Sequence, residues 1–195
     1  DGDEDLIAGN LGDNSLLNAS PAKPLKMYLN DFDNSGTLEQ IICAYENETS
    51  YPVASLDQLT KQINGFRKKY PHYSDFAGEI VTDIFGKEVV ENSVLKEIVL
   101  LQSCVFRNNG DGTFTTEKLP REAQFSAIRD VLVSDFNSDG LSDLAAVGNN
   151  YAVRPSYGRY DASYGWCLLQ QKHGNTLDAL TPAESGLSVK GDARA

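Results

Sequence analysis

Two short stretches of this chain place oxygen-bearing side chains at alternate positions before a glycine. Residues 135–143, Asp-Phe-Asn-Ser-Asp-Gly-Leu-Ser-Asp, carry such side chains at the first, third, fifth and ninth positions. Residues 31–39, Asp-Phe-Asp-Asn-Ser-Gly-Thr-Leu-Glu, repeat this arrangement with glycine again at the sixth position. Calcium takes six to eight oxygen ligands in flexible geometry. Since glycine permits the sharp turn that directs alternate residues towards one ion, both stretches predict calcium-binding loops.

The expected ligands follow from these positions, and we name each stretch after its first residue. The Asp135 loop offers the side chains of Asp135, Asn137, Asp139 and Asp143 and the carbonyl of Leu141. The Asp31 loop offers the side chains of Asp31, Asp33, Ser35 and Glu39 and the carbonyl of Thr37. Because Ser35 is a neutral and weaker ligand, the Asp135 loop is expected to be the stronger site.

A third, partial copy opens the chain. Asp1-Gly-Asp-Glu-Asp5 aligns with the second half of the Asp135 loop, so that Asp1 corresponds to Asp139 and Asp5 to Asp143. The first and third ligand positions have no counterpart, and we expect little or no binding by Asp1, Asp3 and Asp5. The match also suggests a fragment that begins inside a repeat of a longer protein.

Two other interpretations compete with these calcium loops. An EF-hand requires a bidentate Glu at the twelfth position and flanking helices, whereas Ile42 and Ala146 occupy those positions between strand-like segments. The remaining alternative is a solvated acidic turn, since Asp and Asn favour turn geometry without any ion. Residues 108–114, Asn-Asn-Gly-Asp-Gly-Thr-Phe, lack alternating carboxylates and favour a hairpin turn over a cation site.

The elements that must position the loops are strands. Apolar, β-prone segments lead into and out of each loop, and similar segments follow along the chain. The expected strands are residues 25–29, 41–44, 95–101, 104–107, 114–116, 128–134, 144–147 and 166–170, with a loop over 10–24 and a disordered tail over 188–195.

Residues 55–92 interrupt this pattern with a helical insertion. Ser55 and Gln58 form a capping-box signature. Apolar residues at helical spacing predict one helix from Leu56 that ends at Tyr70-Pro71 and a second that ends at Gly86, with a third short turn over 87–91. The insertion is too short to bury its own core. We therefore expect one domain over residues 1–187.

Composition limits the function classes. The net charge of −11 argues against nucleic acid as a partner, because phosphate contacts require clustered Lys and Arg. No apolar run approaches the ~20 residues that span a bilayer, so this segment is not expected to insert into a membrane. Cys43, Cys104 and Cys167 favour buried thiols, although one disulfide with one free thiol stays open.

Catalytic signatures are missing from the sequence. It contains no Gly-x-Ser-x-Gly, P-loop or His-Glu-x-x-His motif. His72 and His173 both stand at predicted turns, where a surface position is favoured over a general base. The sequence therefore predicts a protein that is not an enzyme.

An aromatic run near the C-terminus is the best ligand surface that the sequence offers. Its tyrosines and tryptophan could stack on a ligand while neighbouring charges form hydrogen bonds, although packing between sheets explains the same residues. The candidates are Arg154, Tyr157, Arg159, Tyr160, Asp161 and Trp166.

Taken together, the loops and the hairpin resemble FG-GAP/VCBS repeats. The resemblance is carried by the Asp135 loop, by residues 31–36 and by Phe106-Arg-Asn-Asn-Gly-Asp-Gly-Thr-Phe114. The order of segments is similar to that of VCBS-repeat proteins related to the CRTAC/ASPIC-UnbV group of Bacteroidetes. The resemblance implies a mainly β fold, a partial β-propeller of about three blades or part-blades with a helical insertion, which could self-associate through its open edges.

The resemblance also implies a role. We expect a calcium-binding, non-enzymatic repeat module of an exported or cell-surface protein, extracellular or periplasmic, which serves adhesion or binds a protein or carbohydrate ligand. The alternative is the scaffold portion of a larger polysaccharide-handling enzyme. The sequence specifies neither the ligand nor the oligomeric state.

Overall fold

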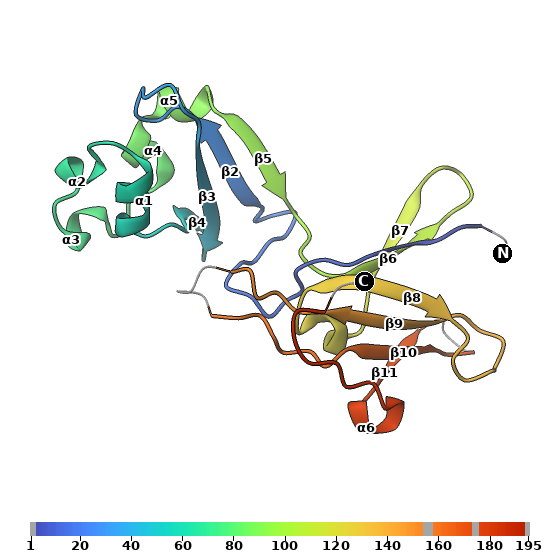
Figure 1. Cartoon of the computed structure of the whole chain (residues 1–195). Helices are drawn as coiled ribbons and strands as arrows, with labels where there is room; N and C mark the ends of the chain where they lie inside the picture. The colour runs from blue at the N-terminus through green and yellow to red at the C-terminus, as the bar shows by residue number, and fades with distance from the viewer. Residues whose placement is uncertain (1–2, 154–157, 173–175, 194–195) are drawn as a thin grey trace. The chain divides into compact units, whose positions relative to one another are not determined.

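The computed structural model describes residues 3–153, 158–172 and 176–193. The fold is mainly β, and its antiparallel sheets stay open within these residues (Figure 1). The chain divides into two compact units. Unit 1 comprises residues 1–16 and 101–195, and unit 2 comprises residues 17–100.

Unit 1 contains two antiparallel sheets. The first has the order β1-β6-β7, formed by Leu6–Ala8, Cys104–Asn108 and Phe114–Lys118. The second is a four-stranded meander with the order β11-β10-β9-β8, formed by Leu177–Leu180, Trp166–Gln170, Asp143–Gly148 and Ile128–Ser134. A 3-10 helix η1, Arg121–Gln124, precedes β8, and α6, Pro182–Ser185, follows β11.

The core of unit 1 lies between these sheets. Val105 of β6 packs in one buried cluster with Leu144 of β9 and Trp166 and Leu168 of β10. Trp166 is 6% exposed, and its indole N–H donates to the carbonyl of Glu122 over 2.7 Å. The tryptophan therefore satisfies its polar atom inside the core.

Unit 2 consists of one sheet and a helical layer. The sheet has the order β4-β3-β2-β5, formed by Thr49–Pro52, Glu39–Glu46, Leu25–Asn30 and Val94–Ile98. The helices are α1 Leu56–Gln62, α2 Phe66–Lys69, α3 Tyr73–Phe76, α4 Val81–Phe85 and α5 Lys87–Glu91.

One face of the unit 2 sheet is buried beneath these helices. Ile41 and Cys43, which alternate along β3, pack in a single cluster with Leu56, Leu59 and Phe66. The capping box that begins α1 is present, with Ser55 and Gln58 each accepting from the other's backbone N–H. The helical residues 55–92 thus share their core with strands.

The helices differ from the sequence expectation in their length. The helix expected from Leu56 is divided into α1 and α2, because Gly65 adopts a left-handed φ of 73° between them. The second is divided into α3 and α4 by Gly78, whose φ is 84°. Periodicity alone could not show these breaks, since the apolar positions continue across both glycines.

The remaining expectations concern the cysteines and the tail. Cys43, Cys104 and Cys167 are all free thiols, so the disulfide left open by the sequence is not formed. Burial raises the pKa of the Cys43 thiol to about 12. In the segment assigned to a tail, the backbone N–H of Val189 donates to Tyr164 and that of Ala193 to Gly148.

Candidate metal-binding loops

The Asp31 loop connects β2 to β3 and is closed by its own carboxylates. The two oxygens of Asp31 accept from the backbone N–H groups of Ser35 (2.9 Å) and Gly36 (2.8 Å). Asp33 Oδ1 also accepts from Ser35 N, and Glu39 accepts from Phe32 N over 2.8 Å. The first, third and ninth positions therefore all face the centre of the turn.

The Asp135 loop connects β8 to β9 with the same hydrogen-bond pattern. Asp135 accepts from the backbone N–H groups of Asp139 (3.1 Å) and Gly140 (2.9 Å). Asn137 Oδ1 accepts from Asp139 N, and Asp143 accepts from Phe136 N over 3.0 Å. Each bond joins positions equivalent to those in the Asp31 loop, which supports two copies of one structural unit.

The backbone conformations of the two loops also agree. The fourth positions, Asn34 and Ser138, have φ of 57° and 61°, and the sixth, Gly36 and Gly140, have φ of 85° and 87°. A Cβ added at either glycine would meet no atom within 4 Å. The glycines are therefore required by their left-handed backbone and not by lack of space.

In the two copies of unit 1, the ninth position is a carboxylate that joins the loop to its sheet. Asp143 is fully buried, and its second oxygen accepts from Gln170 N at the end of β10. Asp5 accepts in the same way from Asn108 N at the end of β6. The strand register is the same in both cases. Gln170 lies two residues after Leu168, which pairs with Leu144, and Asn108 lies two residues after Phe106, which pairs with Leu6. This equivalence supports the partial third copy expected from the sequence.

The two complete loops differ in how closely their carboxylates approach one another. In the Asp31 loop, one oxygen from each of Asp31, Asp33 and Glu39 lies within 4.8 Å of the others. Among the described residues, this is the one such group of three acidic, His or Cys side chains. The third position accounts for part of this difference, since Asp33 of the Asp31 loop is a carboxylate and Asn137 of the Asp135 loop is an amide. In the Asp135 loop the Asn137 amide instead donates to Asp139 over 3.2 Å.

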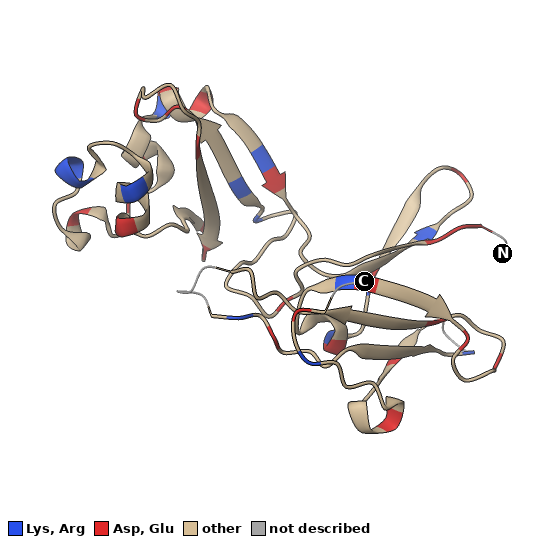
Figure 2. Cartoon of the chain, viewed as in Figure 1, with Lys and Arg blue, Asp and Glu red and all other residues tan. Residues whose placement is uncertain are grey.

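The chemistry of the Asp31 loop suits a hard cation. Its ligand candidates are oxygen atoms, and three of them belong to carboxylates that repel one another without a counter-charge. Backbone hydrogen bonds from Asn64 and a side-chain bond from Ser35 lower the pKa of Asp33, which keeps it ionised. Ser35 and Thr37 are linked by a 2.7 Å hydroxyl contact, and Thr37 donates to Glu39. In Figure 2, the ribbon of both loops is red where acidic residues occur.

The members of the aromatic run that the structure describes do not all lie on one exposed surface. Arg154 and Tyr157 lie outside the described residues. Trp166 belongs to the core of unit 1, and Tyr160 pairs through its backbone with Asn150. The Arg159 guanidinium lies 4.7 Å from the ring centroid of Tyr151, and Asp161 is exposed. Packing therefore accounts for Trp166, whereas Arg159 and Asp161 are exposed.

The chain matches no family model, no curated protein and no solved structure. In the described part of the chain, none of the helices has the length and apolar character needed to cross a bilayer.

Proposed function

We propose that this chain is a calcium-stabilised, non-enzymatic β-repeat module that serves adhesion or ligand binding in an exported or cell-surface protein. The observation that carries the proposal is the shared design of the Asp31 and Asp135 loops. These two segments are far apart in the sequence, yet each forms the same pattern of hydrogen bonds and has a left-handed backbone at its fourth and sixth positions. The pattern places equivalent oxygen atoms around each turn.

The convergence of carboxylates supports the calcium part of this proposal. Asp31, Asp33 and Glu39 would bind the ion, with Ser35 and Thr37 as neutral oxygen donors. Neutralising clustered charges in the folded chain alone stabilises it by mass action, by ~2.7 kcal/mol at a hundredfold excess over the dissociation constant. The Asp135 loop would bind calcium with Asp135, Asn137, Asp139, Leu141 and Asp143.

The packing of unit 1 supports a partial propeller. Asp5 and Asp143 occupy equivalent positions just before or at the start of β1 and β9. After Asp5, the second residue (Ile7) packs in the shared core, whereas after Asp143 the first and third residues (Leu144 and Ala146) do so. Since successive residues of a strand point to opposite faces, the two strands use opposite faces. Equivalent sheets thus meet through opposite faces. Head-to-tail packing of this kind extends in one direction with each added repeat, as blades do in a propeller.

Calcium binding is tested by thermal unfolding of chelator-stripped protein with and without CaCl2, together with isothermal titration. We expect calcium to raise the Tm and to bind with an enthalpy signal. Asp31→Asn combined with Asp33→Asn should remove the part of that Tm increase that comes from the Asp31 loop, while the exposed Asp178→Asn should leave the whole increase intact. Superimposable melting curves with calcium and with chelator would exclude the structural role of the ion.

A further inference from the structure

Two cavities adjoin between the sheets of unit 1. One, of about 390 Å³, is lined by residues of β1, β6, β8, β9, β10 and β11 together with Asp3, Asp5 and Ser142. The other, of about 320 Å³, is lined mainly by residues of β6, β7 and β11. Both include Val105, Arg107 and Leu177, so together they form one groove that we call the Arg107 groove. Each volume lies within the range of small-molecule sites.

We propose that the Arg107 groove binds a neutral, hydroxyl-rich ligand, a saccharide unit. The proposal rests on the ligand-binding part of the proposed function and assigns that role to residues outside the aromatic run. It does not require calcium as a direct ligand contact.

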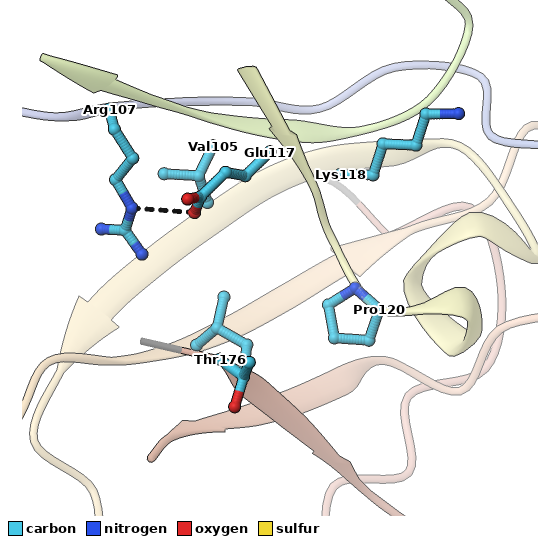
Figure 3. A pocket seen from close by; sticks show the side chains of 7 residues that line it. Val105, Arg107, Glu117, Lys118, Pro120 and Thr176 are labelled. Atoms are coloured by element: carbon cyan, nitrogen blue, oxygen red, sulfur yellow. Dashed lines mark hydrogen bonds and ion pairs between the residues drawn. The ribbon is translucent and has the colours of Figure 1, made fainter. Parts of the chain in front are cut away.

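Arg107 is the fixed hydrogen-bonding group of this groove. Its Nη1 donates to Asp5 over 2.6 Å and its Nε to Glu117 over 3.1 Å, which orients the guanidinium from both neighbouring strands. The side chain is 23% exposed. Among the described residues, Nη2 has no hydrogen-bond partner, so its N–H groups are available to a ligand. Figure 3 shows the Arg107–Glu117 pair and Thr176 around the smaller cavity.

The balance of charge in the groove favours a neutral ligand. Three carboxylates (Asp3, Asp5 and Glu117) line it together with two cations (Arg107 and Lys118). An anion would face the carboxylates, and a cation would face Arg107 and Lys118. A hydroxyl group, in contrast, donates to a carboxylate and accepts from a guanidinium at the same time. The existing ion pairs can therefore stay formed while the ligand bridges them.

The remaining lining suits the two kinds of surface on a sugar ring. Ser142 and Thr176 add hydroxyl groups to the lining. Apolar side chains offer contacts for the C–H groups of a sugar. Val105 and Leu177 line both cavities, and Ile7, Val133 and Leu144 line the larger one. A mainly apolar lining with a small number of polar groups is usual for a site that binds a small molecule.

The test uses the full chain and a panel of neutral disaccharides of glucose, galactose, mannose and N-acetylglucosamine, with glucuronate and glucosamine as charged probes. Saturation-transfer NMR identifies a binder, and titration gives its Kd. We expect a neutral probe to bind, and Arg107→Gln to weaken it about tenfold by removing a charge-assisted hydrogen bond. Thr176→Trp, at an exposed position, should block the groove without touching the core. Arg121→Gln, on η1, is the matched control and should bind normally.

The outcomes separate this proposal from the calcium proposal. Binding of a neutral probe that both groove variants weaken, in protein whose Tm is unchanged, supports the saccharide site. The site is overturned by a panel in which no neutral probe binds, by preference for a charged probe, or by folded variants that bind as well as the parent chain. The calcium response of the Tm is measured on the same samples and is decided independently.

Discussion

The ninth-position carboxylates are the residues on which each loop depends most. Asp143 is fully buried and Glu39 is 4% exposed, although carboxylates are rarely buried without partners. Asp143 is satisfied by two backbone N–H groups, those of Phe136 and Gln170, one from its own loop and one from a neighbouring strand. This residue therefore fixes the loop to the sheet whether or not a cation binds.

Replacing Asp143 by Asn should destabilise unit 1 in the presence of chelator. The amide offers one acceptor oxygen, so its NH2 group would face a backbone N–H that loses its partner inside the protein. We expect a loss of about 2 kcal/mol in the free energy of unfolding, measured by urea titration. Asp178→Asn, on the exposed side of β11, supplies the control. Equal stability of the two variants would show that the two backbone hydrogen bonds of Asp143 contribute little to the stability of unit 1.

At the residue scale, the sequence indicated which loop positions carry the oxygen atoms that accept the backbone hydrogen bonds, and ion binding at these positions stays a prediction. Alternation around Gly36 and Gly140 was enough to predict which side chains face the turn, because the left-handed glycine and backbone hydrogen bonds act within nine residues. The sequence already shows a carboxylate at Asp33 and an amide at the equivalent Asn137. It could not show the side-chain positions, such as the hydrogen bond from the Asn137 amide to Asp139.

At the element scale, strands next to the loops were predictable, whereas long-range pairing was not. The expected strand over 128–134 coincides with β8, and that over 166–170 coincides with β10. The short strands β4 and β11 have no clear alternation and were missed. Pairing of β1 with β6 joins segments nearly a hundred residues apart, and no local pattern specifies such a partner.

The N-terminal cap of α1 is the feature that begins the helical layer of unit 2. Ser55 ends the extended segment after β4 and caps α1, which buries Leu56 and Leu59 against β3. Ser55→Ala should lower the stability of unit 2 by about 1 kcal/mol, measured by far-UV circular dichroism during urea unfolding. Ser55→Asp retains a capping oxygen and should restore most of that loss. A similar loss in both variants would show that the cap itself is not the cause.

At the scale of the whole molecule, unit 2 is inserted into the chain of unit 1. The sequence predicts one domain over residues 1–187, and within the chain the structure distinguishes two compact units that meet in sequence after residues 16 and 100, with buried clusters that have no residue in common. On the unit 1 side, Asn10 N donates to Ser103 Oγ and Gly12 N donates to Leu101 O. The two ends of the interrupted unit are therefore held together by its own hydrogen bonds.

It follows that unit 1 should fold when residues 17–100 are replaced by a short Gly-Ser linker. Loops of 2–6 residues commonly join neighbouring elements, and Gly12 and Leu101 are already in contact. The single tryptophan of the chain, Trp166, lies in the core of unit 1, so its fluorescence reports this unit alone. We expect the shortened chain to keep a blue-shifted emission and a cooperative urea transition close to that of the full chain. An emission already at the wavelength of the urea-unfolded chain would show instead that unit 1 cannot form its core without unit 2.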